Sequence, residues 1–332
     1  MTIPSAASNG ATPSMRHGTG LVLRDALPRH QLLQVVHTAE ETGYEAVFVP
    51  EIAGREAFAT LAALSSATSR MGLGTGVVTV QARSPVTTAM GAATLQELSG
   101  GRFVLGLGAG AAPNPLRAVE EYACVVRAIL AGENVTNERL GVSNFTLGLL
   151  LERSPPPIWL AALGDRMMSL AGRIADGVLL NWCTPERVAQ ARDIVDRSAT
   201  EAGRSPSDVT VAVYVRGCIG VEDAVAYDAL RAATAQYAAI PHYANQLVQM
   251  GLGEESRIAA RALESGGLAD VPARLVRALT VMGGRRDALD RFDAYRRAGA
   301  DVVLWYPVPA LDPFSSILGT LLAAAPSPAL ER

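Results

Sequence analysis

Lysine is absent from this sequence of 332 residues, so arginine accounts for all 29 of its basic residues. Without lysine, no Schiff base can form between a side-chain amine and a substrate or cofactor. An anion in an active site must instead be bound by arginine, by backbone N–H groups or by hydroxyl groups. The net charge of −3 gives no reason to expect nucleic acid or an anionic membrane as a partner.

Cysteine and histidine are scarce. The three cysteines, Cys124, Cys183 and Cys218, are spaced too widely for a metal-binding motif or a disulfide framework. The four histidines form no HxH or HExxH pair. We therefore expect no metal site, because these pairs are the usual signature of zinc ligands.

Long apolar runs are also missing, since none approaches the length of a membrane span. The first residues lack the apolar stretch of a signal peptide and are rich in serine, alanine, proline and threonine. We expect a disordered tail over residues 1–16 and a single domain over 17–332, located in the cytoplasm.

Apolar residues are abundant: 49% of the chain is hydrophobic and 18% is charged, which predicts a large core. Eight short apolar runs rich in β-forming residues follow one another. Most lack polar alternation, as expected of strands that are buried on both faces of a parallel sheet. The runs are 20–24, 45–49, 71–80, 102–107, 157–161, 177–182, 209–216 and 301–305.

Helical patterns separate these runs. One helix is expected from Pro85 to the glycine at 100, and another is capped by Thr184, has Pro185 in its first position and ends at Gly203. Alternation of strand and helix repeated eight times predicts an α/β fold, a (β/α)8 TIM barrel. An open doubly wound sheet is the alternative.

Roughly 85 residues separate the seventh and eighth predicted strands, and they look helical throughout, over about 222–298. An insertion of this size on a barrel is expected to carry function or an interface. Within it, Tyr237, Pro241, His242 and Tyr243 form an aromatic and polar group, in a chain with only 5% aromatic residues. We expect this group to form a wall of the substrate pocket, with a packing corner as the alternative.

In a (β/α)8 barrel, side chains at the C-terminal ends of the strands face the active site. Any one of them alone is more simply a surface residue, so the interpretation depends on the whole set. The Gly-rich string at 106–111 formally fits the dinucleotide-binding fingerprint, but it follows the fourth strand and two prolines interrupt the next helix start. A turn that lets backbone approach a flat ring closely explains it better. The strand-end candidates are Arg24, Asp25, Glu51, 79–83, 108–114, 163–165, 181–184, Arg216 and Tyr306.

Five segments taken together resemble consecutive blocks of the luciferase-like flavin and deazaflavin oxidoreductases. They are EAVFVPE, MGLGTGVVTVQARSP, LSGGRFVLGLGAG, PIWLAALGDRMMSLAGRIADGVLLN and AGADVVLW, and the resemblance covers about residues 19–310. It implies a TIM barrel that binds either FMN or the deazaflavin coenzyme F420.

The subfamily that uses F420 looks closer. Its pattern has a strand-end carboxylate, matched by Glu51, and a bulge with a non-prolyl cis peptide, matched by Gly76-Val77. It also has an asparagine after the Gly-rich turn, matched by Asn114, and a small-residue phosphate loop, matched by 161–164. The residues expected to bind the cofactor are Glu51, Gly76, Val77, Gly108, Asn114, Ala162, Leu163, Gly164, Asp165, Asn181 and Thr184. The simpler interpretations are an ordinary strand glycine at 76 and a salt bridge at the rim for Glu51.

The sequence also departs from one subgroup of this family. A sugar-phosphate dehydrogenase of the family has a glutamate where this chain has Ala111 and a histidine where it has Ile52, so that substrate is excluded. For the proton donor, the candidates are Glu51, His242 and Tyr306, with Tyr243 as a further one.

We expect an oxidoreductase that transfers a hydride between F420 and a small organic substrate, assembled as a homodimer. The alternatives are an FMN-dependent monooxygenase and a catalytically silent cofactor-binding relative.

Overall fold

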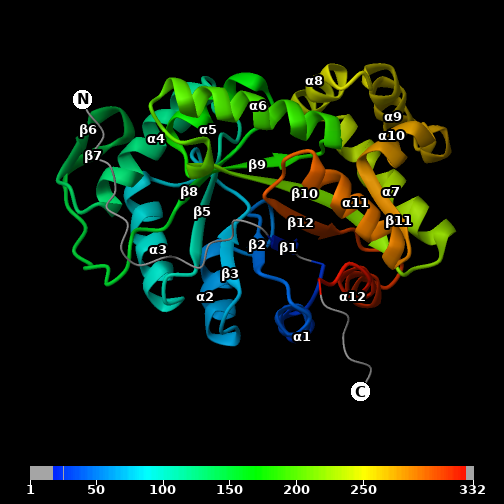
Figure 1. The fold of residues 1–332 in the computed structure, drawn as a ribbon, viewed down its shortest axis with the longest axis horizontal. Coiled ribbons are helices and arrows are strands. Elements are labelled where there is room, and N and C mark those ends of the chain that lie inside the picture. The colour runs from blue at the N-terminus through cyan, green and yellow to red at the C-terminus, as the bar shows by residue number, and fades with distance from the viewer. Residues whose placement is uncertain (1–17, 25, 327–332) are drawn as a thin grey trace.

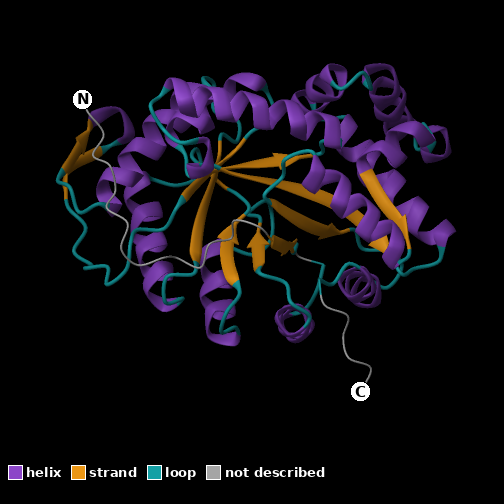
Figure 2. Cartoon of the chain, in the orientation of Figure 1, coloured by secondary structure: helices purple, strands orange, loops and turns teal. Residues whose placement is uncertain are grey.

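The computed structural model describes residues 18–24 and 26–326, so the predicted tail over 1–16 and the candidate Asp25 lie outside the described residues. Its centre is a closed barrel of parallel strands inside a ring of helices (Figures 1 and 2). Closure comes from pairing of the first strand with the last, which rules out the alternative of an open sheet. The barrel strands are β1 (Gly18–Val22), β2 (Ala46–Val49), β3 (Gly72–Thr75) with its continuation β4 (Val78–Thr79), β5 (Phe103–Gly108), β8 (Ile158–Ala161), β9 (Gly177–Asn181), β10 (Thr210–Ile219) and β12 (Val302–Pro307).

The ring helices begin where their capping residues predict. Ser84 accepts a hydrogen bond from the Thr87 N–H ahead of α3, and Thr184 accepts one from the Arg187 N–H ahead of α6. Proline follows both caps in the first helical position. The ring consists of α1 (Arg29–Glu41), α2 (Ala57–Ala67), α3 (Pro85–Leu98), α4 (Pro115–Leu130), α5 (Asp165–Ile174), α6 (Pro185–Glu201), α11 (Arg285–Arg297) and α12 (Pro313–Ala323). No helix among the described residues is both long and apolar enough to cross a membrane.

The insertion between β10 and β12 is mostly helical, but the prediction that it is helical throughout was wrong. It contains a strand, β11 (Thr280–Gly283), which pairs in parallel with the last four residues of β10. Strand β10 is ten residues long and extends beyond its other neighbours, so its end leaves a free edge that β11 covers. The helices of the insertion are α7 (Asp223–Ala238), α8 (Pro241–Gln249), α9 (Gly253–Ser265) and α10 (Ala273–Leu279), ahead of the ring helix α11.

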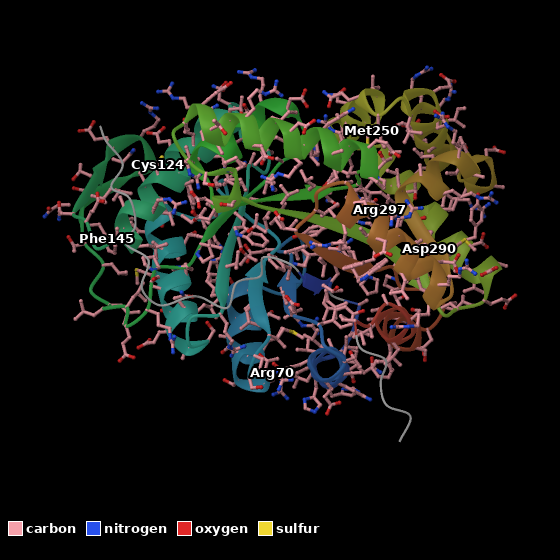
Figure 3. The ribbon with its side chains drawn as sticks, in the orientation of Figure 1. Arg70, Cys124, Phe145, Met250, Asp290 and Arg297 are labelled. Carbon is pink, nitrogen blue, oxygen red and sulfur yellow. The ribbon has the colours of Figure 1, made fainter. Side chains whose placement is uncertain are left out.

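A small antiparallel hairpin, β6 (Val135–Asn137) with β7 (Val142–Phe145), was not predicted. It lies outside the barrel, after α4. Figure 3 places Phe145, the last residue of this hairpin, on the opposite side of the molecule from Met250, which follows α8. The first barrel strand also begins at Gly18, two residues before the predicted run.

The barrel interior combines bulky side chains on some strands with glycines on others. Val22, Phe48, Val104, Trp159, Leu179, Tyr214 and Leu304 are among the side chains that form one buried interior cluster. A Cβ atom on Gly74 would overlap the ring of Phe48, and one on Gly76 would overlap the hydroxyl of Tyr214. The bulky residues therefore fill the space that the glycines leave open.

Candidate cofactor and substrate site

The mouth of the barrel is lined by residues that strand alternation can identify. Side chains of a barrel strand point inward at every second position. On each strand, the interior cluster therefore identifies the inward positions, and the next one toward the C-terminal end lies at the barrel mouth. Tyr306 already belongs to the interior cluster. The other positions are Gly76 above β3, Gly108 at the end of β5, Asn181 at the end of β9 and Arg216 on β10. Strand ends from across the barrel therefore meet in one layer.

The third strand breaks at this layer. The peptide bond between Gly76 and Val77 is cis, as the family resemblance implied. The Gly76 N–H donates to the Val49 carbonyl at 2.9 Å, and the Glu51 N–H donates to the Val77 carbonyl at 3.3 Å, so the end of β2 holds both sides of the bulge. Val77 packs against the interior cluster from above. The bulge thus forms a backbone ledge at the barrel mouth.

Two glycines of β5 make room for this ledge. The Thr75 hydroxyl donates to the Gly106 carbonyl at 2.8 Å and accepts from the Gly106 N–H at 2.7 Å. A Cβ on Gly106 would overlap the Thr75 carbonyl oxygen, and a Cβ on Gly108 would lie 2.6 Å from Val77 Cγ2. The absence of both side chains keeps the two main chains in close contact, and the Val77 side chain occupies the space that a side chain on Gly108 would need.

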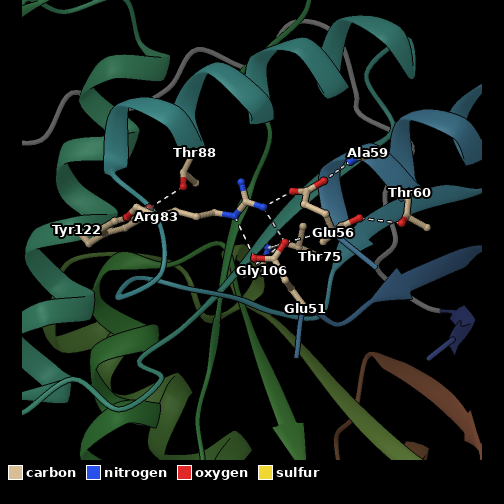
Figure 4. Close-up of polar contacts among 10 residues, drawn as sticks. Glu51, Glu56, Ala59, Thr60, Thr75, Arg83, Thr88, Gly106 and Tyr122 are labelled. Carbon is tan, nitrogen blue, oxygen red and sulfur yellow. Dashed lines mark hydrogen bonds and ion pairs between the residues drawn. The ribbon is translucent and has the colours of Figure 1, made fainter. Parts of the chain in front are cut away.

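Glu51 lies beside the ledge in a network with Arg83 (Figure 4). The guanidinium donates to both carboxylate oxygens, from Nε at 3.0 Å and from Nη2 at 2.7 Å, and also to Glu56. The Ala57 N–H donates to the same carboxylate at 3.0 Å. Partial burial alone would raise the pKa of Glu51, but the hydrogen bonds from Arg83 and Ala57 outweigh it and hold that pKa below its usual value. The simpler interpretation of Glu51, a salt bridge at the rim, therefore describes its contacts.

Replacing Arg83 by methionine is expected to lower the free energy of unfolding by about 2 kcal/mol, because two carboxylates lose their shared cation. The pKa of Glu51 lies below its usual 4.5 in the folded protein. The stabilisation is therefore complete above pH 4.5 and is lost as the pH falls through the lower folded pKa. Urea denaturation of both proteins across this pH range measures the effect.

The matched control is Arg139→Met, which removes an arginine whose side chain is 58% exposed and paired with Glu121. An exposed pair contributes about 0.5 kcal/mol or less. Equal losses for the two variants, or a loss at Arg83 that does not change with pH, would contradict the assigned role of the Glu51 pair.

On the opposite side of the mouth, Arg216 is the central residue, only 2% exposed. Its Nη1 donates to the Asn181 side-chain oxygen, and Asn181 in turn donates to the Tyr243 hydroxyl at 2.7 Å. The guanidinium lies 4.5 Å from the ring of Trp182 and 4.2 Å from the ring of Tyr306, within cation–π range. Helix α8 and three barrel strands therefore meet around one buried cation.

Trp182 adopts the left-handed conformation, with φ of 53°, which costs a bulky residue free energy. Side chains from two helices hold the turn around Trp182 by donating hydrogen bonds to its backbone carbonyls. Gln246 Nε2 donates to the Asn181 carbonyl at 2.9 Å and to the Trp182 carbonyl at 2.7 Å, and the Tyr295 hydroxyl donates to the Cys183 carbonyl at 2.5 Å. Helices α8 and α11 thus fix the Trp182 ring against the guanidinium.

The proton-donor candidates lie in different environments. Burial strongly raises the pKa of Tyr306, so its hydroxyl is protonated near neutral pH and can donate a hydrogen bond. Burial also raises the pKa of Tyr243, to about 12, and its hydroxyl already accepts from Asn181. His242 is on the exposed side of α8, and partial burial lowers its pKa. Tyr306 is therefore the candidate that belongs to the mouth layer.

The predicted phosphate loop leads directly into α5. Gly164 precedes its first turn, where the leading backbone N–H groups have no acceptor within the helix. Arg187, which is 4% exposed, donates to the Leu163 carbonyl at 3.1 Å and forms an ion pair with Asp165 at 2.7 Å. This pair balances the negative charge of Asp165 beside the loop.

Of the other residues predicted to bind the cofactor, some form hydrogen bonds within the chain and some do not. Asn114 is exposed and precedes α4 without a side-chain capping bond, whereas Thr184 caps α6. Ala162 is buried, and its N–H donates to the Leu179 carbonyl at 3.1 Å. Among the residues described here, no group of three or more His, Cys, Asp and Glu side chains could hold a metal ion.

A cavity of about 390 Å³ opens beside the buried cation. Its walls come from the ends of β1, β9, β10 and β12 and from α7, and include Arg24, Trp182, Arg216, Ala233, Tyr237 and Tyr306. Of the four insertion residues predicted to form a pocket wall, Tyr237 lines this cavity and the other three do not. Helix α7 rather than α8 is therefore the wall that the insertion supplies.

Reasoning from the sequence recognised Arg216 and Tyr306 as strand-end residues but missed their partners. Trp182 lay within the predicted range 181–184 without a role of its own, and an arginine of the 181–187 loop, which is Arg187, was expected to meet the anionic tail of the cofactor. Gln246 was not singled out, and neither was Tyr214, whose hydroxyl lies behind Gly76. Two-residue alternation along β10 carried a usable signal, since it places Tyr214 and Arg216 on the same inward face. No comparable signal indicates that Gln246 binds two carbonyls of a turn 64 and 65 residues away.

Comparison with known proteins gives a consistent picture. The profile of the family described as luciferase-like monooxygenase matches residues 8–302. The chain is 31% identical over 210 residues to a 5,10-methylenetetrahydromethanopterin reductase of Methanolobus tindarius, a match over 59% of this chain and 64% of that protein, less than two thirds of its length. It is 32% identical over 250 residues to a Mycobacterium tuberculosis protein whose name describes a coenzyme F420-dependent oxidoreductase, a match over 67% of this chain and 72% of the relative.

Solved structures share the same fold. A coenzyme F420-dependent tetrahydromethanopterin reductase from Methanopyrus kandleri superposes with a TM-score of 0.79 at 24% identity, over 93% of this chain and 98% of that one. A monooxygenase from Streptomyces bottropensis superposes with a TM-score of 0.68 at 22% identity, over the same shares of the two chains. At these identities, the likeness shows the barrel architecture alone.

Proposed function

The chain belongs to the family of luciferase-like monooxygenases and is an oxidoreductase of that class, and from this premise we propose that it transfers a hydride between coenzyme F420 and a small organic substrate. The observation that carries the proposal is the ledge at the barrel mouth. Val77 lies there beside Gly108, where any Cβ would lie 2.6 Å from Val77 Cγ2. A flat tricyclic ring would rest against the half-buried Val77, which the missing side chain of Gly108 allows to pack closely onto β5.

The choice of F420 over FMN is supported by the relatives. The M. tuberculosis relative matches two thirds of this chain and is named for F420. Methylenetetrahydromethanopterin reductases from several archaea also align with the chain, among them one from Archaeoglobus fulgidus, 27% identical over 83% of this chain. FMN-dependent monooxygenation is the second candidate, favoured by the family's description and by the fold shared with a monooxygenase.

The residues of this chain would bind and orient rather than react. When bound, the deazaflavin supplies the ring carbon that accepts or releases a hydride. The ledge at Gly76-Val77 would support one face of the ring, and the first turn of α5 would receive the phosphate of its tail. Glu51 stays ionised, because Arg83 and the Ala57 N–H hold its pKa low, so it can accept a hydrogen bond from the cofactor but is a poor proton donor.

The opposite wall would serve the substrate. Tyr306 keeps its proton near neutral pH because burial raises its pKa, and its hydroxyl has no hydrogen-bond partner among the described residues. It can therefore donate a hydrogen bond to a substrate oxygen at the mouth. Trp182 and Tyr237, whose ring centroids are 4.7 Å apart, form an aromatic surface that excludes water from the same side.

F420 is expected to bind at least about tenfold more tightly than FMN, a difference of about 1.4 kcal/mol. Fluorescence titration of the purified protein with each cofactor separately measures the two affinities. Equal or tighter binding of FMN would overturn the choice of cofactor and favour the monooxygenase. The affinity for F420 should fall with added salt, because its tail is anionic.

Turnover separates both enzymes from a catalytically silent relative. With F420 bound, a decrease or recovery of deazaflavin absorbance on addition of an oxidised or reduced organic substrate would support hydride transfer. If tight binding of F420 is accompanied by no absorbance change across a panel of ketones, aldehydes, alcohols and enoates, the silent relative is the better description.

A further inference from the structure

Arg216 is a buried cation without a counter-charge. It is 2% exposed, and it forms no ion pair with any described carboxylate. Its Nη1 donates to the neutral Asn181, and its Nη2 has no partner among the described residues. The aromatic rings around it offset part of the cost of burying a guanidinium. Buried charges are otherwise paired with an opposite charge, because desolvation is costly.

The described lining of the cavity beside Arg216 likewise carries positive charge and no negative charge. Two arginines line it, Arg216 within and Arg24 at the exposed rim, and no aspartate or glutamate is among its described lining residues. Trp182 Nε1 and the Tyr306 hydroxyl are buried hydrogen-bond donors of the same lining, and they too lack partners in the described chain. Three donors and an unpaired positive charge are complementary to the oxygens of an anion.

Apart from Gln236 and the hydroxyl-bearing Tyr237, the rest of the cavity lining is apolar. Helix α7 contributes Ala229, Ala232 and Ala233, whose small side chains leave space, and Val22 and Val308 close other sides. A volume of about 390 Å³ is near the lower end for ligand pockets. The occupant that fits is therefore a small molecule with an apolar body and one anionic end.

We propose that the substrate of this enzyme is a small organic carboxylate, whose carboxylate is held by Arg216, Trp182 and Tyr306 and whose apolar body lies against α7. This inference depends on the proposed function for the reaction, because it names the substrate class of the same site. The binding of the anion depends only on the residues of the cavity. An anionic group of the cofactor is the other source of the same chemistry.

The test uses benzoate as the anionic probe and benzamide as its neutral counterpart of similar shape. Isothermal titration of the full-length protein without cofactor, at constant ionic strength, is expected to show benzoate binding at least about tenfold more tightly than benzamide. Arg216→Gln is expected to abolish this preference, and Arg139→Gln, at an exposed arginine outside the cavity, to change benzoate affinity less than about threefold. Equal affinity of the two probes, or an unchanged preference in folded Arg216→Gln, would overturn the proposal.

If Arg216→Gln does not fold, Arg216→Lys, which preserves the positive charge, tests whether the guanidinium holds the carboxylate. Lysine lacks the planar fork, so the preference for benzoate should persist at reduced affinity. A benzoate affinity in folded Arg216→Lys equal to that of the wild type would show that the guanidinium does not hold the carboxylate and would overturn the proposal. No preference in either protein would reject it.

A second titration separates the two sources of the anion. Benzoate affinity measured with saturating F420 is expected to remain within about threefold of its value without cofactor, because the ledge and the cavity are formed by different strands. Competition between F420 and benzoate would assign Arg216 to the cofactor and overturn the carboxylate substrate. Failure of F420 to bind while benzoate binds would refute the proposed function and leave the anion site intact.

Discussion

Replacing Gly108 by leucine is expected to weaken F420 binding by about 100-fold while the protein still folds. The residue is the last inward position of β5, and the Val77 side chain occupies the space that a side chain here would need. A leucine there would displace Val77 and cover the ledge. Overpacked contacts cost about 1–3 kcal/mol, and each 1.4 kcal/mol is a factor of about ten in affinity.

Fluorescence titration with F420 measures this loss, and circular dichroism shows whether the barrel is retained. Gly148→Leu is the matched control, since nothing lies within 4 Å of a Cβ at that glycine. Unchanged F420 affinity in a folded Gly108→Leu protein would mean that the cofactor binds elsewhere, and the ledge would lose its assigned role.

Replacing Gly106 by alanine is expected to reduce the free energy of unfolding by about 3 kcal/mol. A Cβ at this position would overlap the carbonyl oxygen of Thr75, which is main chain and cannot rotate away. Both main chains are also held by the Thr75 hydroxyl, which bonds the N–H and the carbonyl of Gly106. The overlap can therefore be relieved only if β3 and β5 move apart.

Urea denaturation of Gly106→Ala against the wild type tests this, with Gly148→Ala as the variant that should change stability by less than about 0.5 kcal/mol. If Gly106→Ala costs no more than that control, β3 must be able to shift away from β5 at little cost. The close approach of the two strands would then be incidental to the fold.

Most of the barrel was predictable because its strands are apolar on both faces, a pattern that needs no knowledge of partners. The exceptions show where tertiary contacts decide. Gly18 is a poor strand former, yet it extends β1 because β12 offers Val302 as a pairing partner. Strand β11 was hidden between two helical patterns and forms because the end of β10 extends beyond the barrel.

The two sides of the site differ in how far the sequence predicts them. The ledge follows from local sequence and family resemblance, since Gly76, Val77 and Gly108 lie in short motifs. The surroundings of Arg216 do not follow from local sequence, because the packing of the inserted helix α7 is what brings Tyr237 to Arg216. Long-range contacts of this kind depend on helix packing that periodicity alone does not fix.

The interlocking of glycines with bulky residues inside the barrel constrains how this sequence can evolve. Phe48 occupies the space that a side chain on Gly74 would need, and Tyr214 does the same for Gly76. An enlargement at either glycine is tolerated only after its partner has become smaller, and a smaller partner alone leaves a void. Such pairs are expected to show strong epistasis, with both single replacements harmful and the double replacement nearly neutral. Lineages that reshape this barrel for new substrates should therefore change these positions together.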